Sequence, residues 1–342
     1  MRYQFGLLLL CATGWSADRT AKVTTLLDTF PPGEAGVSVA IIEDGKPAMF
    51  SRGMANLETR TPATPATNYR LASMTKQFTA TAILLLAEDG KLRLDQTIDQ
   101  YFPQFPAYAK SITIRHLLTH TGGLWDYEEL IPSTQTTPFK DAEAVKFSAT
   151  HATPYFAPGS KFQYSNTGYA ALAEIVRLRS GMRFAEFLKT RIFDPVGMKG
   201  TVAHEEGQDT VANRAYGYTG RKRTDQNLTS AVLGDGGIYS SIEDLVRWNA
   251  ALDRAQLLPR GVLDEATHGG TLTTGEPLPY GYGWFVDPYK NFARHWHSGE
   301  TIGFRTAVQR FPERKLVVIV LSNRNTLDAR KLSLDLADIY LQ

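Results

Sequence analysis

Strand-like segments stand near both ends of this 342-residue chain, with a long and mostly helical stretch between them. Near the start, GVSVAIIEDGKPAMFSRG (residues 36–53) alternates in polarity and breaks at Asp44-Gly45, as two strands joined by a tight hairpin do. Near the end, TAVQRF (306–311) and KLVVIVLSN (315–323) flank a second break. We therefore expect one antiparallel sheet that is closed by the two ends of the chain.

The middle of the chain carries the start and stop signals of helices. We expect helices over residues 75–88, 114–119, 168–179, 242–252 and, at the end, 328–340. The predicted fold class is α/β: an antiparallel sheet built from both chain ends, flanked by helices, with an inserted mostly helical region. No repeat or linker divides the chain, so we expect a single unit over 18–342, with its sheet from about 30–60 and 290–342 and its helical insert from about 80–290.

The N-terminus has the pattern of an export signal. Arg2 supplies a positive charge, residues 5–12 are apolar, and small residues follow up to Ala17. The apolar run is too short to span a bilayer, which needs about 20 residues. We expect a signal peptide over 1–17, no stable membrane span, and a periplasmic or extracellular protein. A buried first helix is the alternative.

Composition excludes several kinds of site and partner. Cys11 is the only cysteine, so a processed chain would lack disulfides, thiolate metal sites and a cysteine nucleophile. A lipid anchor at Cys11 is disfavoured by the bulk of Leu10 before it. The 37 basic and 35 acidic residues nearly balance without a basic run, which argues against nucleic acid as a partner. No pattern indicates the oligomeric state.

A serine and a lysine stand three residues apart in LASMTKQF, residues 71–78, at the start of an apolar helix. Residues i and i+3 share a helix face with Cβ atoms about 5–6 Å apart, so Ser73 and Lys76 can touch. A desolvated lysine loses its proton more easily, and the neutral amine can take the proton of a hydroxyl. The structural alternative is an N-cap at Ser73 and a surface lysine.

Two further short motifs follow. YSN (164–166) stands before the expected helix at 168, where a phenol and an amide can project together into a cleft. As a structural alternative, Asn166 or Thr167 caps that helix. HSG (297–299) heads a strand near the C-terminus, where a glycine lets a substrate backbone lie close along the strand.

Taken in order, S-x-x-K, Y-x-N and H-x-G resemble the motifs of penicillin-recognising serine hydrolases. That group contains class C β-lactamases, serine D-alanyl-D-alanine carboxypeptidases, D-aminopeptidases and related esterases. The resemblance runs from about Gly36 to Asn325 and includes DGKLRLDQTI, ITIRHLLTHTGGLWDY, RIFDPVGMKGT, LGDGGIYSSIEDLVRW and YGYGW. It implies an exported serine hydrolase that forms an acyl-enzyme on small amides, peptides or esters, without a cofactor. The alternatives are a true β-lactamase and a binding module that holds penicillin or muropeptides without turnover.

The resemblance also implies residue roles. Ser73 would attack the carbonyl carbon, Lys76 would take its proton, and Tyr164 would relay that proton to the leaving group. Nearby cations would lower the tyrosine pKa from its usual value of about 10. The backbone N–H groups of Ser73 and Glu300 would bind the oxyanion. The substrate-binding residues would be Asn166, which also holds the lysine, His297, Ser298 and Gly299.

Two positions depart from the commoner family pattern. His297 stands where many members have lysine, and histidine titrates near neutrality, so any grip on a substrate carboxylate should depend on pH. Glu300 would repel an anionic substrate if its side chain faced the cleft. Arg294 and Arg305 are only sequence neighbours of the site, and neither can be matched to a carboxylate-binding cation. Peptidase or esterase activity is therefore favoured over β-lactamase activity.

Other kinds of site have weaker support. His116 and His120 have the i, i+4 spacing of a helical zinc pair, but no H-E-x-x-H accompanies them. His295 and His297 share one face of a strand, which is equally weak as a metal site. No G-x-S-x-G occurs, so a nucleophile elbow of the α/β-hydrolase type is unsupported.

Overall fold

A computed structural model describes residues 17–342 of the chain. The expected signal peptide lies almost wholly outside the described residues, so it stays a prediction. The described part begins with helix α1, Ala17–Leu27. From residue 17 onward, no helix has both the length and the apolar composition needed to cross a membrane.

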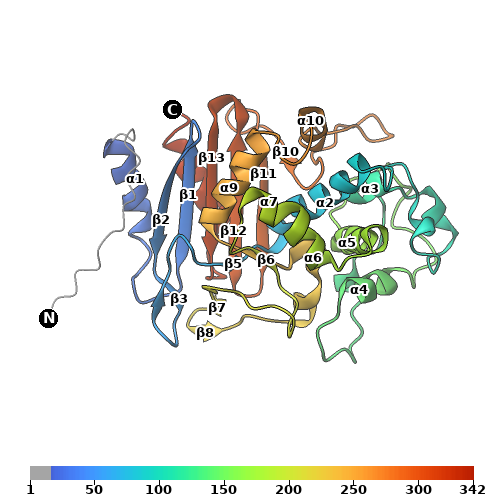
Figure 1. Cartoon of the computed structure of the whole chain (residues 1–342), viewed down its shortest axis with the longest axis horizontal. Helices are drawn as coiled ribbons and strands as arrows, with labels where there is room; N and C mark the ends of the chain where they lie inside the picture. Colours follow the sequence, from blue (N-terminus) through green and yellow to red (C-terminus); the bar gives the residue numbers. More distant parts are fainter. Residues whose placement is uncertain (1–16) are drawn as a thin grey trace.

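One six-stranded antiparallel sheet joins the two ends of the chain (Figure 1). Its order is β10-β11-β12-β13-β1-β2. The strands are β10 (Phe285–Val286), β11 (His295–Thr301), β12 (Phe304–Phe311), β13 (Leu316–Ser322), β1 (Val37–Glu43) and β2 (Lys46–Arg52). In the middle of the sheet, Val37 lies opposite Ser322, so the N-terminal and C-terminal segments pair directly. The predicted fold class is confirmed.

The hairpin between β1 and β2 has the predicted turn. Asp44 and Gly45 have φ values of 50° and 76°. Positive φ at both central residues is the requirement of a type I′ turn, whose twist matches that of the flanking strands. Glycine adopts this conformation freely and aspartate tolerates it, so the Asp-Gly pair sets the register of the two strands.

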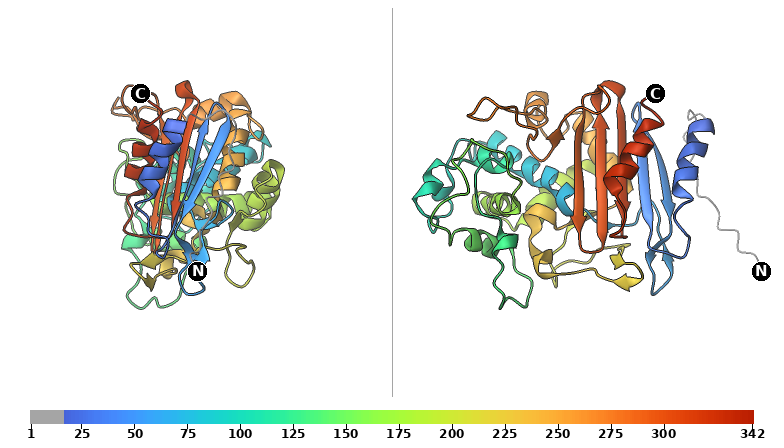
Figure 2. Two further views of the ribbon diagram at one scale, coloured as in Figure 1. Left: turned by 90° about the vertical axis from the view of Figure 1, so that its left-hand side faces the viewer. Right: turned by 180° about the vertical axis from the view of Figure 1, so that it is seen from behind.

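The two faces of the sheet bury different cores (Figure 2). Because strand side chains alternate, Val39 and Ile41 of β1 join one core while Ala40 and Ile42 join the other. The first core is covered by α1 and by α11, Ala329–Asp338. The second core continues into the helical region, and α9, Ile242–Asp253, packs against β1 and β13 there.

The helical region is built around α2, Lys76–Glu88, which is buried continuously from Lys76 to Leu86. The five expected helices are present, with ends that differ from the predicted ones by at most two residues. The remaining helices are α3 (Ile114–Leu118), α4 (Asp141–Ser148), α5 (Asn166–Ser180), α6 (Phe184–Leu188), α7 (Asp194–Val196), α8 (Leu233–Gly236) and α10 (Arg260–Ala266). Of these, α4, α6, α7, α8 and α10 were not expected.

Small sheets fix the segments around the helices. A three-stranded sheet of order β5-β9-β6 consists of Tyr69–Arg70 (β5), Ile238–Ser240 (β9) and Val202–Ala203 (β6). It places the chain just before Ser73 beside the segment that follows α8. Two ribbons complete the structure, β3 (Met54–Asn56) with β4 (Thr61–Pro62) and β7 (Tyr218–Thr219) with β8 (Lys222–Arg223).

Candidate active site

Ser73 lies on a short 3-10 turn, Ala72–Thr75, between β5 and α2. Ala72 has a φ of 50°, a left-handed conformation that costs a non-glycine residue about 1–3 kcal/mol. The alternative of Ser73 as an N-cap is wrong, because α2 begins at Lys76 and no side chain caps it. The Ser73 hydroxyl instead accepts a hydrogen bond from Lys76 Nζ at 3.2 Å. The turn therefore presents this hydroxyl to the lysine and not to the helix backbone.

Lys76 is fully buried. Besides its bond to the serine, its Nζ donates to Asn166 Oδ1 at 2.8 Å and to the carbonyl oxygen of Asp235 at 3.1 Å. Burial lowers the lysine pKa to about 8, and the charges of Asp235, Asp126 and Glu128 oppose that shift. About one Lys76 side chain in ten is then neutral at pH 7. A surface lysine is excluded, and this amine can act as a base near neutral pH.

Asn166 is the first residue of α5, and its side chain is directed to Lys76. The structural alternative is wrong here too, because the N-cap is Ser165 and no side chain of that helix caps its start. Asp126, from the loop between α3 and α4, accepts the Asn166 backbone N–H at 2.5 Å. A carboxylate is favourable at a helix N-terminus, where the backbone dipoles present positive charge. Because Asp126 takes this role, the asparagine amide is left for the lysine.

The phenol ring of Tyr164 also lies beside Lys76. The lysine Nζ lies 4.7 Å from the centre of its ring. Its hydroxyl is buried and has no hydrogen-bond partner within residues 17–342, although an interaction with Ser73 is the influence that lowers its pKa. Burial outweighs that influence and holds the pKa well above its usual value. The expectation that cations lower this pKa is therefore wrong, and the phenol keeps its proton at neutral pH.

His297, on β11, is buried and neutral. Its Nδ1 lies 2.6 Å from the Ser298 carbonyl oxygen, which can only accept, so Nδ1 carries the proton. Its Nε2 then accepts from the Tyr280 hydroxyl at 2.9 Å. Burial, and next the charge of Lys76, lower the histidine pKa to about 3. The expectation of a titration near neutrality is wrong, because this ring sits inside the protein beside a cation.

Gly299 allows β11 to lie directly against the turn that carries Ser73. A Cβ at this position would stand 2.1 Å from the Leu71 carbonyl oxygen, so only glycine fits. Thr306 on the neighbouring strand donates to that same oxygen at 2.7 Å. The next residue, Glu300, lies at the solvent-exposed edge of the cavity at Ser73, and 71% of its side chain is exposed. Strand and turn are thus held together where the two oxyanion donors are predicted, and those donors stay a prediction.

The cavity at the serine has a marked acidic character. It holds about 40 Å³ and is lined by residues that include Ser73, Asn166, Glu128, Asp235 and Glu300. Glu128 is exposed at the rim but packed on one side, and this partial burial, with nearby negative charge, raises its pKa to about 7. The buried carboxylate of Asp235 accepts the Tyr127 hydroxyl at 2.6 Å, and its pKa is raised by burial.

These acidic residues were missed from sequence. Asp126 and Glu128 belong to LWDYEEL, whose run of three carboxylates directly after the THTGG turn was an available signal. Asp235 lies in LGDGG, where the unusual aspartate between glycines was another. Neither sequence pattern shows that these carboxylates lie near Lys76, because the lysine belongs to a third, distant segment of the chain.

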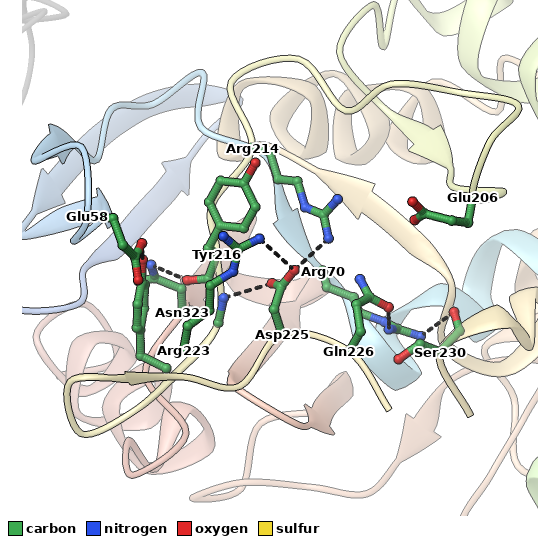
Figure 3. A network of polar contacts seen from close by, with 12 residues as sticks. Glu58, Arg70, Glu206, Arg214, Tyr216, Arg223, Asp225, Gln226, Ser230 and Asn323 are labelled. Carbon is green, nitrogen blue, oxygen red and sulfur yellow. Dashed lines mark hydrogen bonds and ion pairs between the residues drawn. The ribbon is translucent and has the colours of Figure 1, made fainter. Parts of the chain in front are cut away.

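A network of polar contacts anchors the loop between β6 and α8, residues 204–232, which contributes Thr229 to the cavity lining (Figure 3). Arg70 donates to the carbonyl oxygens of Gly236 at 3.2 Å and Ser230 at 3.0 Å. Further along the loop, Arg214 pairs with Asp225 at 2.6 Å. Figure 3 shows Arg214, which belongs to the loop, beside Asp225, and Arg70 of β5 beside Ser230. These contacts hold the loop in place next to Asp235, whose carbonyl oxygen accepts a hydrogen bond from Lys76.

The histidines considered as metal ligands bind backbone groups. His116 Nδ1 accepts the Thr113 backbone N–H at 3.1 Å and caps α3. His120 lies beyond that helix, and its Nδ1 accepts the Ser165 backbone N–H at 3.1 Å. From residue 17 to the C-terminus, no three histidine, cysteine or acidic side chains are grouped to hold a metal ion.

A second cavity, larger at about 530 Å³, lies between α3 and α10. Its lining includes Arg115, Glu265 and Tyr282, which contact one another. None of the three sequence motifs contributes a side chain to it. The motif residues gather instead at or beside the smaller cavity, where Ser73, Lys76, Tyr164, Asn166 and His297 come together from three segments of the chain.

Comparison with known proteins agrees with this geometry. A family model described as Beta-lactamase matches residues 25–341. A penicillin-binding protein of Bacillus subtilis (strain 168) is 30% identical over 335 residues, which cover 90% of this chain and 72% of that protein. A D-aminopeptidase of Gluconobacter oxydans (strain 621H) is 31% identical over 322 residues, with 90% of this chain and 59% of that longer protein covered. The crystal structure of D-amino acid amidase from Ochrobactrum anthropi SV3 superimposes with a TM-score of 0.82 at 26% identity, covering 94% and 97% of the two chains. A family-model match over nearly the whole chain, together with a relative that is 30% identical and covered to 72%, means that the chain belongs to the Beta-lactamase family of serine hydrolases.

Proposed function

We propose that the chain hydrolyses small amides and peptides through an acyl-enzyme on Ser73. The observation that carries the proposal is the buried Lys76, whose Nζ lies 3.2 Å from Ser73 Oγ and whose pKa is lowered to about 8. A surface lysine of ordinary pKa would supply almost no neutral amine at pH 7. Such a base next to a hydroxyl is the arrangement that activates a serine nucleophile.

Acylation uses the three side chains in sequence. Neutral Lys76 takes the proton of Ser73 as its oxygen attacks the carbonyl carbon, and the carbonyl electrons move to the oxygen. Tyr164 donates its phenolic proton to the leaving nitrogen as the carbon–nitrogen bond breaks. Lys76 then returns its proton to the phenolate, which restores both groups. Asn166 keeps the lysine in place throughout, through the 2.8 Å bond to its Nζ.

Deacylation repeats these steps with water as the nucleophile. Water adds to the acyl carbon while the neutral amine of Lys76, which is paired with the still protonated Tyr164, accepts the water proton. The ester bond to Ser73 then breaks, and the serine oxygen recovers a proton from the same pair. No cofactor enters this scheme, because the reaction moves only protons and an acyl group.

The acidic rim favours a substrate that carries a free amino group. Glu128 and Glu300 both line the cavity at Ser73. The two arginines considered as carboxylate anchors are already paired, Arg294 with Asp287 and Arg305 with Glu300 at 3.5 Å. Negative charge at the entrance attracts an ammonium group and repels the carboxylate of a β-lactam. The named activities of the D-aminopeptidase and D-amino acid amidase relatives are in line with this preference.

Turnover of matched substrates tests the proposal. D-alanine amide, its N-acetyl derivative, L-alanine amide and nitrocefin are incubated with the full chain and with Ser73→Ala. We expect hydrolysis of the free D-amide, at least tenfold slower hydrolysis of the N-acetyl compound, and no turnover by the variant. Intact mass should show the acyl group on Ser73 when the reaction is quenched early.

Two outcomes favour the alternatives. Faster hydrolysis of nitrocefin than of any amide indicates a β-lactamase. One acylation per molecule without turnover indicates a binding module for penicillins or muropeptides. Glu128→Gln separates charge from shape, because it should weaken the preference for the free amine without changing hydrolysis of the N-acetyl compound.

We also propose export, which the pattern at residues 1–17 supports. Expression of the full chain in a bacterium, followed by fractionation and N-terminal sequencing, tests it. A processed protein outside the cytoplasm that begins near residue 18 is the expected result. An unprocessed chain in the cytoplasm contradicts it.

A further inference from the structure

His120 has a backbone conformation that is uncommon among residues other than glycine. It follows α3 with a φ of 56°, in the left-handed region where a non-glycine residue is strained. It is also buried, with only 2% of its surface exposed. Strain of this kind persists only where surrounding contacts fix the residue. The sequence pattern offered it a role in a zinc pair, and its contacts point to a different role.

His120 accepts two hydrogen bonds, one from each of the residues on either side of Tyr164. Its carbonyl oxygen accepts the Gln163 backbone N–H at 3.0 Å. Its Nδ1 accepts the Ser165 backbone N–H at 3.1 Å. A single residue thus binds the backbone on both sides of the phenol, once through its main chain and once through its ring.

The imidazole ring also lies against the phenol. The ring centres of His120 and Tyr164 are 4.2 Å apart at an interplanar angle of 31°. Tyr280 packs against the same imidazole at 4.6 Å. On the side of the lysine, the Nζ of Lys76 stands 4.7 Å from the centre of the Tyr164 ring. The position of the phenol is therefore set by its own backbone and by the imidazole.

A neutral histidine can both accept the Ser165 backbone N–H and pack its ring against Tyr164, and His120 is neutral here. Burial, and next the positive charge of Lys76, hold the His120 pKa well below its usual value. Since Nδ1 accepts a hydrogen bond, the proton is on Nε2. A phenylalanine would keep the flat ring and lose the acceptor, whereas an asparagine would tolerate the left-handed backbone and lose the ring.

We propose that His120 is the positioning residue of Tyr164, holding the phenol where it delivers its proton to the leaving group. The inference rests on the proposed function, in which Tyr164 is the proton donor. It concerns geometry only: His120 touches neither the serine nor the lysine through any hydrogen bond that involves its ring. Loss of this contact should matter most where the leaving group needs a proton.

The test compares two leaving groups on the same acyl group. An alkyl amide must be protonated to leave, whereas p-nitrophenolate leaves without help. In His120→Phe and in His120→Asn, we expect kcat/KM for the amide to fall about 10- to 100-fold more than kcat/KM for the p-nitrophenyl ester. KM for the amide should change little, because the substituted residue lies behind the phenol.

His116→Phe is the matched control, since His116 also binds a backbone N–H through Nδ1 but does not contact Tyr164. Its ratio of amide to ester activity should equal that of the wild type. Equal losses on both substrates in His120→Phe and His120→Asn, or an equal change in His116→Phe, would overturn the positioning role. If the wild type hydrolyses neither substrate, the proposed function fails. Positioning is then decided by crystal structures of the variants, where an unmoved Tyr164 ring contradicts it.

Discussion

The rate of Ser73 acylation should rise with pH along a limb centred near pH 8. The reacting form of Lys76 is the neutral amine, so raising the pH increases the reacting fraction. The lysine pKa is lowered from 10.5 to about 8, which corresponds to about 3 kcal/mol and to about 300-fold more neutral amine at pH 7. From pH 6 to pH 8 the neutral fraction rises about 50-fold, and the labelling rate should follow it.

Covalent labelling by an uncharged fluorophosphonate measures this limb directly. The reagent does not titrate, and its fluoride leaves without a proton from Tyr164. Intact mass gives the labelled fraction against time from pH 5.5 to 9.5. Lys76→Arg is the control, because an arginine keeps the charge but holds its proton over the whole range. It should be labelled at least 100-fold more slowly, without recovery at high pH.

Glu128 must be separated from the lysine, because its pKa of about 7 lies close by. Its carboxylate is among the charges that raise the lysine pKa. Glu128→Gln should therefore keep the limb and move its midpoint slightly below pH 8. A limb that disappears in Glu128→Gln, or one that survives in Lys76→Arg, would refute the assignment of Lys76 as the base.

Substitutions at Gly299, Asp126 and His297 give further expected outcomes. Gly299→Ala should lower the free energy of unfolding in urea by about 1–3 kcal/mol, because its Cβ would stand 2.1 Å from the Leu71 carbonyl oxygen; an unchanged midpoint contradicts this. Asp126→Ala removes the carboxylate that accepts the Asn166 N–H, so urea unfolding should show a loss of about 0.5–2 kcal/mol. Asp126→Ala should also move the acylation limb below pH 8, since that carboxylate raises the lysine pKa. The pKa of His297 is about 3 in the folded chain, whereas its usual value is 6.5. As the pH drops from 6.5 towards 3, the unfolded chain binds a proton that the folded chain does not, so the free energy of unfolding should fall. The thermal unfolding temperature of His297→Gln should depend less on pH in that window.

Local patterns predicted the sheet and the helices well because their causes are local. The Asp44-Gly45 pair indicates a tight hairpin because it stands between two segments of alternating polarity, and the apolar run after Lys76 marks a helix buried on all sides. A sheet closed by the two ends of the chain was expected from the strand-like segments there, and the pairing of β1 with β13 confirms it. The extent of the single unit, residues 18–342, stays a prediction.

Charge states could not be predicted in the same way. The pKa values of Tyr164 and His297 depend on burial by residues that are distant in sequence, and both expectations were wrong in direction or in range. The structural alternative of a cap at Asn166 or Thr167 was wrong because Asp126, 40 positions before Asn166, occupies the helix start instead. In each case a long-range contact replaced a local preference.

Titration behaviour leaves one candidate for the base among the motif residues. Tyr164 cannot serve as a resident base, because burial holds its pKa well above its usual value and it keeps its proton. His297 is neutral, but its Nδ1 proton is bound to the Ser298 carbonyl and its Nε2 lone pair accepts the Tyr280 hydroxyl. Neither nitrogen is then available to Ser73. Lys76 alone combines contact with the serine and a pKa of about 8, which is why the proposed mechanism passes the proton to the lysine first and supplies the leaving group from the phenol.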